Sequence, residues 1–294
     1  MIPLEAACIG YKVKEAAAHE ARGSIHSVFR TVVNMSLNGD IYSISTGETP
    51  RTPYIMTIDE KLAIGIHEGQ DVQLKPEGLY LGPRLVVEML RAAVWKPRSR
   101  KGVMKPRLAA ISLSGSISAH GREGGMKPLL NLFTETLEED TPYSSKAKRV
   151  VKELINGGLS NESLGSVTDL LGLGPGLTPS GDDLLCGLLS TLHFSRLPSS
   201  LSQAKVRLEL LVKEEIGRRT NTISGSFLRH YSDGLVDENT DDLITALSKG
   251  SLNQMDNAVE RLCRIGHSSG TDIAIGVLVA LKIMEIEKVE KDYG

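Results

Sequence analysis

Residues 171–187 carry the densest set of groups that could bind a small ligand, in the order Leu-Gly-Leu-Gly-Pro-Gly-Leu-Thr-Pro-Ser-Gly-Asp-Asp-Leu-Leu-Cys-Gly. Gly172, Gly174 and Gly176 occupy alternate positions, and a glycine backbone can take positive φ and come close to a ligand. A helix start follows, where free backbone N–H groups and the helix dipole favour an anion. The sequence therefore predicts an anion site between the glycine run and the helix.

Two adjacent carboxylates, Asp182 and Asp183, stand at this helix start. They would repel a phosphate directly, so they suit a magnesium ion that bridges to the phosphate, or a neutral hydrogen-bond donor. Ser180 with Asp183 matches a capping box, with an acid in place of the usual Glu or Gln. Thr178 before Pro179 is a second candidate N-cap. An ordinary capped helix after a loop is the alternative, and this segment alone does not exclude it.

A second copy of this helix start occurs near the C-terminus, where the segment that begins at Ser269 aligns without a gap on the first. Asp272 corresponds to Asp183, and Gly276 corresponds to Gly187. We expect two like helices that cross closely at the two glycines and aim their N-termini at one pocket. The repeat makes a ligand site the favoured interpretation, whereas either segment alone is more typical of an ordinary capped helix.

Basic and hydroxyl side chains lie between the two helix starts, where Arg218 and Arg219 precede Thr222 and Ser224. Guanidinium and hydroxyl groups bind carboxylate and phosphate oxygens, although a helix break with capping residues gives the same pattern. His267, just before the second helix start, fits either a general base or an ordinary loop histidine.

Three other side chains are weaker candidates for chemistry. His120 lies in a glycine-rich segment, and it fits a loop histidine better than a catalytic one. His193 and Cys186 lie on apolar helical faces, where we expect them in the core.

Composition and charge exclude several classes of protein. The 294 residues include 34 Lys plus Arg and 36 Asp plus Glu, and this net charge of −2 builds no positive field for nucleic acid. No apolar run approaches the roughly 18 residues that indicate a membrane-spanning helix, and the N-terminus lacks the charge order of a secretory signal. The three cysteines show no metal or redox spacing. We expect a cytoplasmic protein with no nucleic-acid or membrane partner.

The sequence pattern around these residues predicts strands in the first part of the chain and helices in the second, which together make an α+β fold class. Short alternating apolar runs between residues 26 and 82 predict a β-rich barrel or sandwich, and Asn38-Gly39 is a strong hairpin signal. The predicted strands cover residues 27–36, 41–46, 54–58, 62–67 and 72–74, and a helix is predicted at 85–95. The basic segment 96–107 fits a solvated linker, with a positive rim for an anionic substrate as the alternative.

The later part of the chain reads as mainly helical. A buried strand is predicted at residues 108–113, opening into a glycine-rich loop at 114–125. Apolar residues then recur at three- and four-residue steps, which is the period of a helix. The predicted helices cover residues 129–138, 146–155, 163–171, 184–194, 204–218, 258–263 and 271–290. We therefore expect a β-rich domain at 1–106 and a mainly α-helical domain at 107–294 that carries the glycine-rich motifs.

The chain resembles a bacterial family known as domain of unknown function 2877. The resemblance rests on Gly-Pro-Gly-Leu-Thr-Pro-Ser-Gly-Asp-Asp at residues 174–183 with Gly187, and on Gly-His-x-Ser-Gly-x-Asp at residues 266–272 with Gly276. Leu184 departs from the pattern, which has an aromatic residue there. The family includes the small H subunit attributed to oxamate carbamoyltransferase in anaerobic allantoin degradation. The resemblance thus implies a multi-subunit enzyme, with part of the catalytic centre on partner subunits.

The resemblance also implies a reaction, the conversion of oxalurate plus phosphate to oxamate plus carbamoyl phosphate. Backbone N–H groups and hydroxyls would then hold the oxygens of a small anionic substrate, and the acids would orient its amide nitrogen or a magnesium ion. The predicted catalytic residues are Asp182, Asp183, Asp272 and His267. The predicted anion-binding residues are Gly174, Gly176, Thr178, Ser180, Gly181, Arg218, Arg219, Thr222, Ser224, Ser269, Gly270 and Thr271.

Magnesium, on Asp182 and Asp183, is the one cofactor that these residues suggest. Two other functions stay open from the residues themselves. One is a stand-alone magnesium-dependent phosphotransferase or phosphohydrolase that uses the same acids. The other is a non-catalytic ligand-binding or assembly subunit, because no activated nucleophile stands in the sequence.

Overall fold

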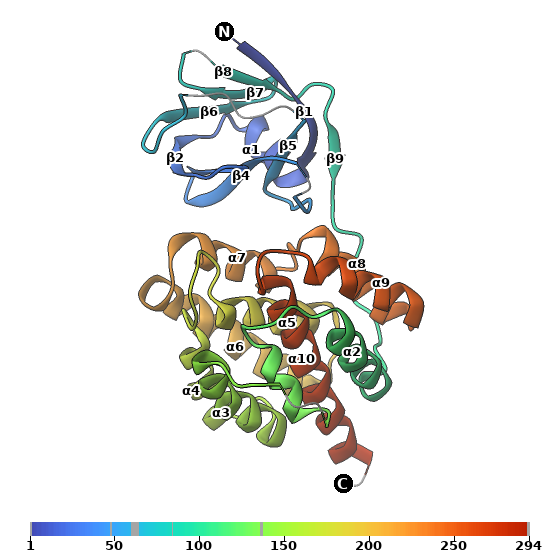
Figure 1. Ribbon diagram of the computed structural model, residues 1–294. Coiled ribbons are helices and arrows are strands. Elements are labelled where there is room, and N and C mark those ends of the chain that lie inside the picture. Colours follow the sequence, from blue (N-terminus) through green and yellow to red (C-terminus); the bar gives the residue numbers. More distant parts are fainter. Residues whose placement is uncertain (1, 48, 60–64, 84, 136–137, 293–294) are drawn as a thin grey trace. The chain divides into compact units, whose positions relative to one another are not determined.

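The computed structural model describes residues 2–47, 49–59, 65–83, 85–135 and 138–292. Contacts divide the chain into two compact units, Met1–Pro97 and Arg98–Gly294, which are coloured along the sequence in Figure 1. The predicted domain boundary, after residue 106, lies further along the chain. The first unit is β-rich and the second is mainly helical, so the predicted α+β fold class is confirmed.

The first unit is a closed barrel of eight strands to which a further strand is added. Its elements are β1 Ile2–Gly10, α1 Tyr11–Ala18, β2 Arg22–Val28, β3 Val32–Leu37, β4 Asp40–Thr46, β5 Ile55–Ile58, β6 Asp71–Lys75, β7 Gly78–Leu81, β8 Leu85–Glu88 and β9 Ala93–Trp95. The strand order is β5-β4-β3-β2-β6-β7-β8-β1, and β1 pairs with β5 to close the ring. Strand β9 pairs with the end of β1. Of the two predicted architectures, the barrel is therefore the one that forms.

The hairpin between β3 and β4 shows how local sequence fixes this barrel. Asn38 and Gly39 have φ values of 51° and 89°, and a two-residue type I′ turn needs positive φ at both positions. The two strands pair directly across this turn. Val33 and Met35 alternate along β3 and are buried, as expected for the inner face of a strand. The predicted hairpin is confirmed.

Residues 85–95 form β8 and β9 rather than the predicted helix. Strand β8 pairs in parallel with the start of β1, and β9 pairs in parallel with its end. Val86 and Val87 are β-branched, which favours a strand because a helix restricts their side chains. The predicted strand 27–36 is divided between β2 and β3. Of the predicted strand 62–67, residues 62–64 lie outside the described residues and 65–67 are not in a strand.

The second unit is a helical bundle, and most of its predicted helices are confirmed. Its elements are α2 Pro106–His120, η1 Lys127–Leu132, α3 Pro142–Gly157, α4 Asn161–Val167, η2 Thr168–Leu170, α5 Ser180–Phe194, α6 Ser199–Arg219, α7 Thr222–Ser232, α8 Glu238–Lys249, α9 Leu252–Cys263 and α10 Ser269–Asp292. The helix predicted at 129–138 is wrong in type, because the described residues there form only the short 3-10 helix η1.

Residues 108–113, predicted as a strand, lie inside α2. Pro106 occupies the first turn, where a proline loses no helical hydrogen bond. Leu113 and Ile117 are fully buried four residues apart, which is a helical spacing. The glycine-rich loop therefore begins only at Gly121, where the helix ends.

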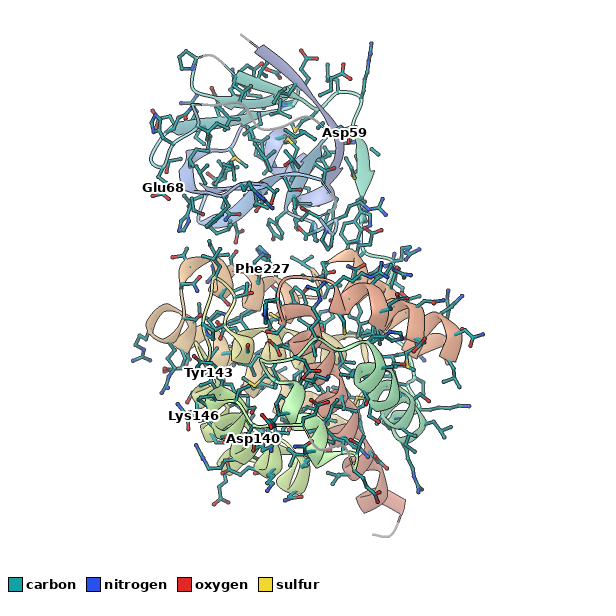
Figure 2. The ribbon with its side chains drawn as sticks, viewed as in Figure 1. Asp59, Glu68, Asp140, Tyr143, Lys146 and Phe227 are labelled. Atoms are coloured by element: carbon teal, nitrogen blue, oxygen red, sulfur yellow. The ribbon has the colours of Figure 1, made fainter. Side chains whose placement is uncertain are left out.

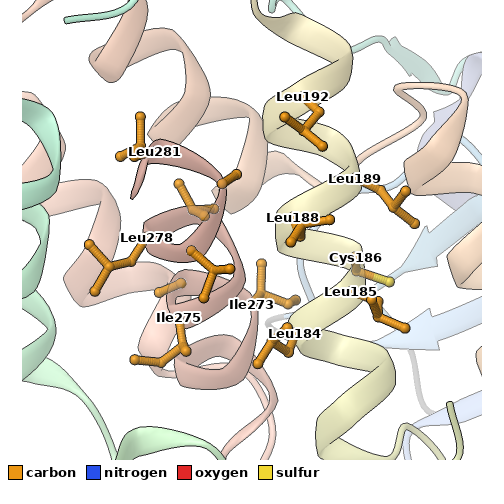
Figure 3. Close-up of a cluster of buried hydrophobic side chains, with 14 of the residues drawn as sticks. Leu184, Leu185, Cys186, Leu188, Leu189, Leu192, Ile273, Ile275, Leu278 and Leu281 are labelled. Atoms are coloured by element: carbon orange, nitrogen blue, oxygen red, sulfur yellow. The ribbon is translucent and has the colours of Figure 1, made fainter. Parts of the chain in front are cut away.

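Helices α5 and α10 form the centre of the bundle, and their buried aliphatic side chains pack together in Figure 3. A Cβ atom on Gly187 would lie 2.0 Å from the carbonyl oxygen of Ile273, and one on Gly276 would lie 1.9 Å from that of Leu184. The two backbones therefore touch at both glycines, which confirms the predicted crossing. The contacts are reciprocal, because Ile273 corresponds to Leu184 in the repeat.

Candidate functional site

The two repeated helix starts lie side by side. The Thr178 hydroxyl, just before α5, is 3.1 Å from the hydroxyl of Ser269, the first residue of α10. Asp183 and Asp272, each in the first turn of its helix, interact electrostatically. We refer to residues 172–183 and 265–272 as the paired helix start.

The glycine run before α5 takes the predicted backbone conformation. Gly172, Gly174 and Gly176 have φ values of 70°, 118° and 98°, in the left-handed region that glycine adopts at little cost. Gly172 also needs glycine for space, because a Cβ atom there would lie 2.0 Å from the carbonyl oxygen of Arg219. Nothing lies within 4 Å of such an atom on Gly176, which is exposed. The tip of the loop is open to solvent.

Two of the predicted anion-binding amides are used inside the chain. The Gly181 N–H donates to a carbonyl of its preceding loop at 2.8 Å, and the Gly270 N–H does the same at 3.2 Å. A Cβ atom on Gly181 would lie 2.0 Å from the Leu170 carbonyl oxygen, and one on Gly270 would lie 1.7 Å from that of Leu262. These glycines let each helix start pack against the chain that precedes it.

The start of α5 has no side-chain cap. Its N-cap residue is Pro179, which offers no side-chain acceptor, so the predicted capping box and the alternative cap are both wrong. The Thr178 hydroxyl contacts Ser269 instead, and the Ser180 hydroxyl bonds to Asp272. Both hydroxyls are therefore engaged with residues of α10.

Helix α3 shows an ordinary capped start in the same unit. Thr141 accepts from the Ser144 amide at 2.9 Å, and the Ser144 hydroxyl accepts from the Thr141 amide at 2.8 Å. Asp140, just before this capping box, and Tyr143, within it, are labelled in Figure 2. The α5 start differs from it, so an ordinary capped helix does not describe the first motif.

Asp182 binds three donors of its own chain. Its Oδ1 accepts from the Gly172 amide at 2.8 Å, and its Oδ2 accepts from the Ser224 hydroxyl at 2.7 Å and from the Thr220 hydroxyl. Burial raises the pKa of Asp182, and these three hydrogen bonds oppose the rise. Asp182 and Ser224 thus join the glycine run to the break between α6 and α7, which is a positioning role.

Asp183 has a buried oxygen without a hydrogen-bond partner. Its Oδ2 is enclosed and accepts no bond from the described residues. Burial first, and the charge of Asp272 second, raise the pKa of Asp183 well above its ordinary value, although the Ser269 and Thr178 hydroxyls oppose the rise. An unpaired buried acceptor costs about 1–3 kcal/mol. Asp183 is therefore a group whose hydrogen bonding a ligand could complete.

Asp272 is held by the loop that precedes η1. Its Oδ1 accepts from the Met126 amide at 2.6 Å, and its Oδ2 accepts from the Ser268 hydroxyl at 2.9 Å. Burial raises the pKa of Asp272 to about 7, and hydrogen bonds from Met126, Ser180 and Ser268 oppose the rise. Gly125 packs so closely that a Cβ atom there would lie 2.4 Å from Oδ1.

The two carboxyls form a pair that retains a proton. Two buried carboxylates close together cannot both ionise without a large cost, and both pKa values are raised. The serines are exchanged between the helices, because Ser180 of α5 bonds to Asp272 and Ser269 of α10 bonds to Asp183. Such a pair can donate one hydrogen bond and accept another, which matches an amide group.

The predicted basic residues already have acidic partners. Arg218 lies 2.6 Å from Glu215, and Arg219 lies 3.0 Å from Glu215 and 4.0 Å from Asp169. Thr222 is exposed as the first residue of α7. That these three residues bind a substrate anion stays a prediction.

Arg122 is a residue of the site that the sequence reasoning missed. Its backbone N–H donates to the Thr271 hydroxyl at 2.9 Å, and its Nη1 donates to the Gly266 carbonyl at 2.6 Å. The exposed His267 lies beside the same glycine-rich loop, because its Cε1 atom is 3.9 Å from the position that a Cβ atom on Gly124 would take. The signal was the cluster of glycines at residues 121–125, a second glycine run beside the second helix start.

The other histidine and cysteine candidates lie in local structural contacts. His120 Nε2 lies 3.2 Å from Asp256, which also accepts from the Ser116 hydroxyl at 2.7 Å. Cys186 is buried in the core, as predicted. His193 is half-buried, and its Nδ1 lies 3.0 Å from the Ser232 carbonyl oxygen.

The donor set does not fit the predicted magnesium ion. Both oxygens of Asp182 already accept hydrogen bonds, so of the two predicted magnesium ligands only Asp183 keeps an oxygen without a partner among the described residues. Within the part of the chain that the structure describes, three or more His, Cys, Asp or Glu side chains nowhere gather as metal ligands would. The carboxyl pair is therefore treated as a proton-holding group.

The fold and the site define an α+β protein in which a closed barrel precedes a bundle built on a repeated, glycine-crossed helix start. Residues 6–94 match the AllH family N-terminal domain, and residues 170–281 match the family described as oxamate carbamoyltransferase subunit AllH. The matches cover most of the chain, and the chain belongs to the AllH family. No solved structure matches it. Among the described helices, none has the length and apolar character to cross a membrane.

Proposed function

We propose that this chain is the substrate-binding subunit of a carbamoyl-transfer enzyme that converts oxalurate plus phosphate to oxamate plus carbamoyl phosphate. The family description, an oxamate carbamoyltransferase subunit, supports the class of reaction. The paired helix start supports the place of binding. Partner subunits would complete the enzyme.

The unpaired buried oxygen of Asp183 is the observation that carries this proposal. It lies where two helix starts, one exposed glycine loop and several hydroxyls come together, and it lacks a donor. An amide N–H of oxalurate or oxamate would supply that donor. Because the carboxyl pair also retains a proton that it can donate, an amide group, which both donates and accepts, matches it more fully than a simple anion does.

The remaining groups divide between the two ends of such a substrate. Backbone N–H groups of residues 174–180 other than the two prolines, and those of Ser269 and Thr271, would hold carboxylate or phosphate oxygens. The Thr178, Ser180 and Ser269 hydroxyls, which bond to one another and to the two carboxyls, would hold Asp183 and Asp272 in position. Arg122, beside the second helix start, would balance negative charge.

The reaction moves a proton from the phosphate to the oxamate nitrogen, and the carboxyl pair can relay it in two transfers. A phosphate oxygen attacks the carbamoyl carbon of oxalurate and forms a C–O bond. The C–N bond between that carbon and the nitrogen that oxamate keeps then breaks. That nitrogen takes a proton from the Asp183 and Asp272 pair, and the phosphate hydroxyl returns one to it. A pKa of about 7 at Asp272 suits an acid and base that work near neutral pH.

Binding to the purified full chain tests the proposal. Calorimetry with oxalurate, in phosphate buffer, should show that Asp183→Ala weakens binding by about ten-fold or more, the loss expected for one hydrogen bond in a buried site. Asp233→Ala is the matched control, because Asp233 is exposed and pairs with Lys213. Equal affinities of the wild type and the Asp183→Ala protein would contradict the proposed site.

A further inference from the structure

An apolar groove of about 340 Å³ lies between α2 and the turn that joins α8 to α9. Its floor includes the buried Leu247 and Met255. Its walls include Leu108 and Leu252, which are 61% and 58% exposed. All of these residues belong to the second unit, so the groove is a feature of the helical bundle itself.

The exposed aliphatic side chains continue along the helices that border the groove. Val103 is 64% exposed at its edge, and Ile111, three residues after Leu108 on α2, is 60% exposed. Single exposed leucines are normal on protein surfaces. Val103, Leu108 and Leu252 line the same groove, and large apolar side chains gathered in this way are instead typical of an interaction site.

The spacing of these side chains fits a third helix. Leu108 and Ile111 are three apart on α2, and Leu252 and Met255 are three apart on α9, which packs against α2. Two adjoining helices with such ridges leave a groove that accepts the apolar face of another helix.

The positive charge at the groove favours a helix that carries acidic side chains. Lys105 and Lys249 line it, and neither has an acidic partner within 4.0 Å among the described residues. Lys105 is also the N-cap of α2, whose first turn contains no acid, so the dipole of α2 adds to the positive potential. Carboxylates of an occupant would be stabilised at both places.

One hydroxyl at the groove also lacks a partner. Ser248, between Leu247 and Lys249, has a buried Oγ that makes no hydrogen bond with the described residues. A polar group of an occupant that reached it would complete its bonding.

We propose that this groove binds an amphipathic, acidic α-helix of a partner enzyme subunit. The helix would present aliphatic side chains at positions i and i+3 or i+4, with carboxylates beside them for Lys105 and Lys249. The inference rests on the proposed function only in that the chain acts as a subunit, and it concerns a surface distinct from the paired helix start.

The test uses the full chain and the separately purified partner subunits of the same carbamoyltransferase. We expect Leu108→Glu and Leu252→Glu each to weaken the complex by about ten-fold or more, as for central residues of an interface. Lys105→Glu should weaken it too, and added salt should reduce the difference between this variant and the wild type. Leu210→Glu is the matched control, because Leu210 is 56% exposed on α6.

The outcomes separate this inference from the proposed function. Wild-type complex formation with unchanged affinity in the groove variants would overturn the groove and leave the subunit role intact. If the wild-type chain bound no partner subunit, the groove would have no such occupant and the inference would be wrong. In that case the measurement of oxalurate binding to the chain alone would still test the proposed substrate site at Asp183. Equal losses in Leu210→Glu and Leu108→Glu would also overturn the groove, because the effect would not be local.

Discussion

Asp183 and Asp272 are side chains that water would ionise, yet the fold buries them together at the two helix starts. Their adjacency costs stability, because each raises the difficulty of ionising the other. Hydrogen bonds from the Met126 amide and the Ser268 hydroxyl offset part of this cost at Asp272. Asp183, in contrast, keeps one oxygen without a partner among the described residues. A site that is under-satisfied without ligand is a site that ligand can stabilise.

At this scale we predict that Asp183→Asn abolishes most turnover of the assembled enzyme without unfolding the chain. Asparagine keeps the shape and a hydrogen-bond donor but cannot exchange a proton, so kcat should fall by about 100-fold or more. The melting temperature should stay equal or rise, because one buried acid is gone. A steady-state assay and a thermal melt check both parts. A large fall in melting temperature with kcat unchanged would show a structural role instead.

The raised pKa of Asp272 predicts how stability depends on pH. The unfolded chain releases this proton near pH ~3.9, whereas the folded chain keeps it to about pH 7. Between these values the folded state binds more protons, so the free energy of unfolding falls as pH rises through this window. Thermal melts between pH 5 and pH 8 should show this fall, and Asp272→Asn should make it shallower, with the raised pKa of Asp183 accounting for part of what remains. Equal slopes in the two proteins would contradict the prediction.

At the scale of elements, the repeat was the most informative feature of the sequence. The match between the two segments predicted both the helix pair and its glycine crossing. Hydrogen-bond partners were not predictable in this way, because capping by Ser180 and bonding of Ser180 to Asp272 need the same residue types. The loop at residues 121–125 was likewise missed as part of the site, because its contacts with α10 are distant in sequence.

The crossing predicts a strong contrast between two glycine substitutions in helices. Gly187→Ala should destabilise the chain by about 3 kcal/mol or more, because its Cβ would lie 2.0 Å from the Ile273 carbonyl oxygen. Gly217→Ala on α6 should stabilise it by about 0.5–1 kcal/mol, since nothing lies within 4 Å of its Cβ position. Urea denaturation measures both. Similar effects of the two changes would mean that the helices do not touch at Gly187.

At the scale of the whole molecule, the fold class and the order of its two parts were predictable. The exact partition was less so. Residues 85–95 read as a helix by their apolar spacing, whereas parallel pairing with β1 makes them strands. Such pairing joins residues about eighty positions apart, and no local pattern reports it.

The chain alone should bind its substrate but turn over slowly or not at all. The paired helix start offers binding groups and a proton-holding pair, without an activated nucleophile, so partner subunits should raise the rate. The measurement is carbamoyl phosphate formation from oxalurate and phosphate, with and without partner subunits and with and without magnesium. Turnover by the chain alone at an ordinary enzyme rate, about 1–1,000 per second, would show a complete active site here.

The place of β1 in the barrel has a consequence for synthesis. Strand β1 is made before the other strands of the barrel, but its neighbours are β5, β8 and β9, and Ile2 pairs with Leu85. The ring cannot close until β8 has emerged, so β1 waits with an unpaired edge while most of the unit is made. During that interval the nascent chain exposes a strand edge that other chains can pair with.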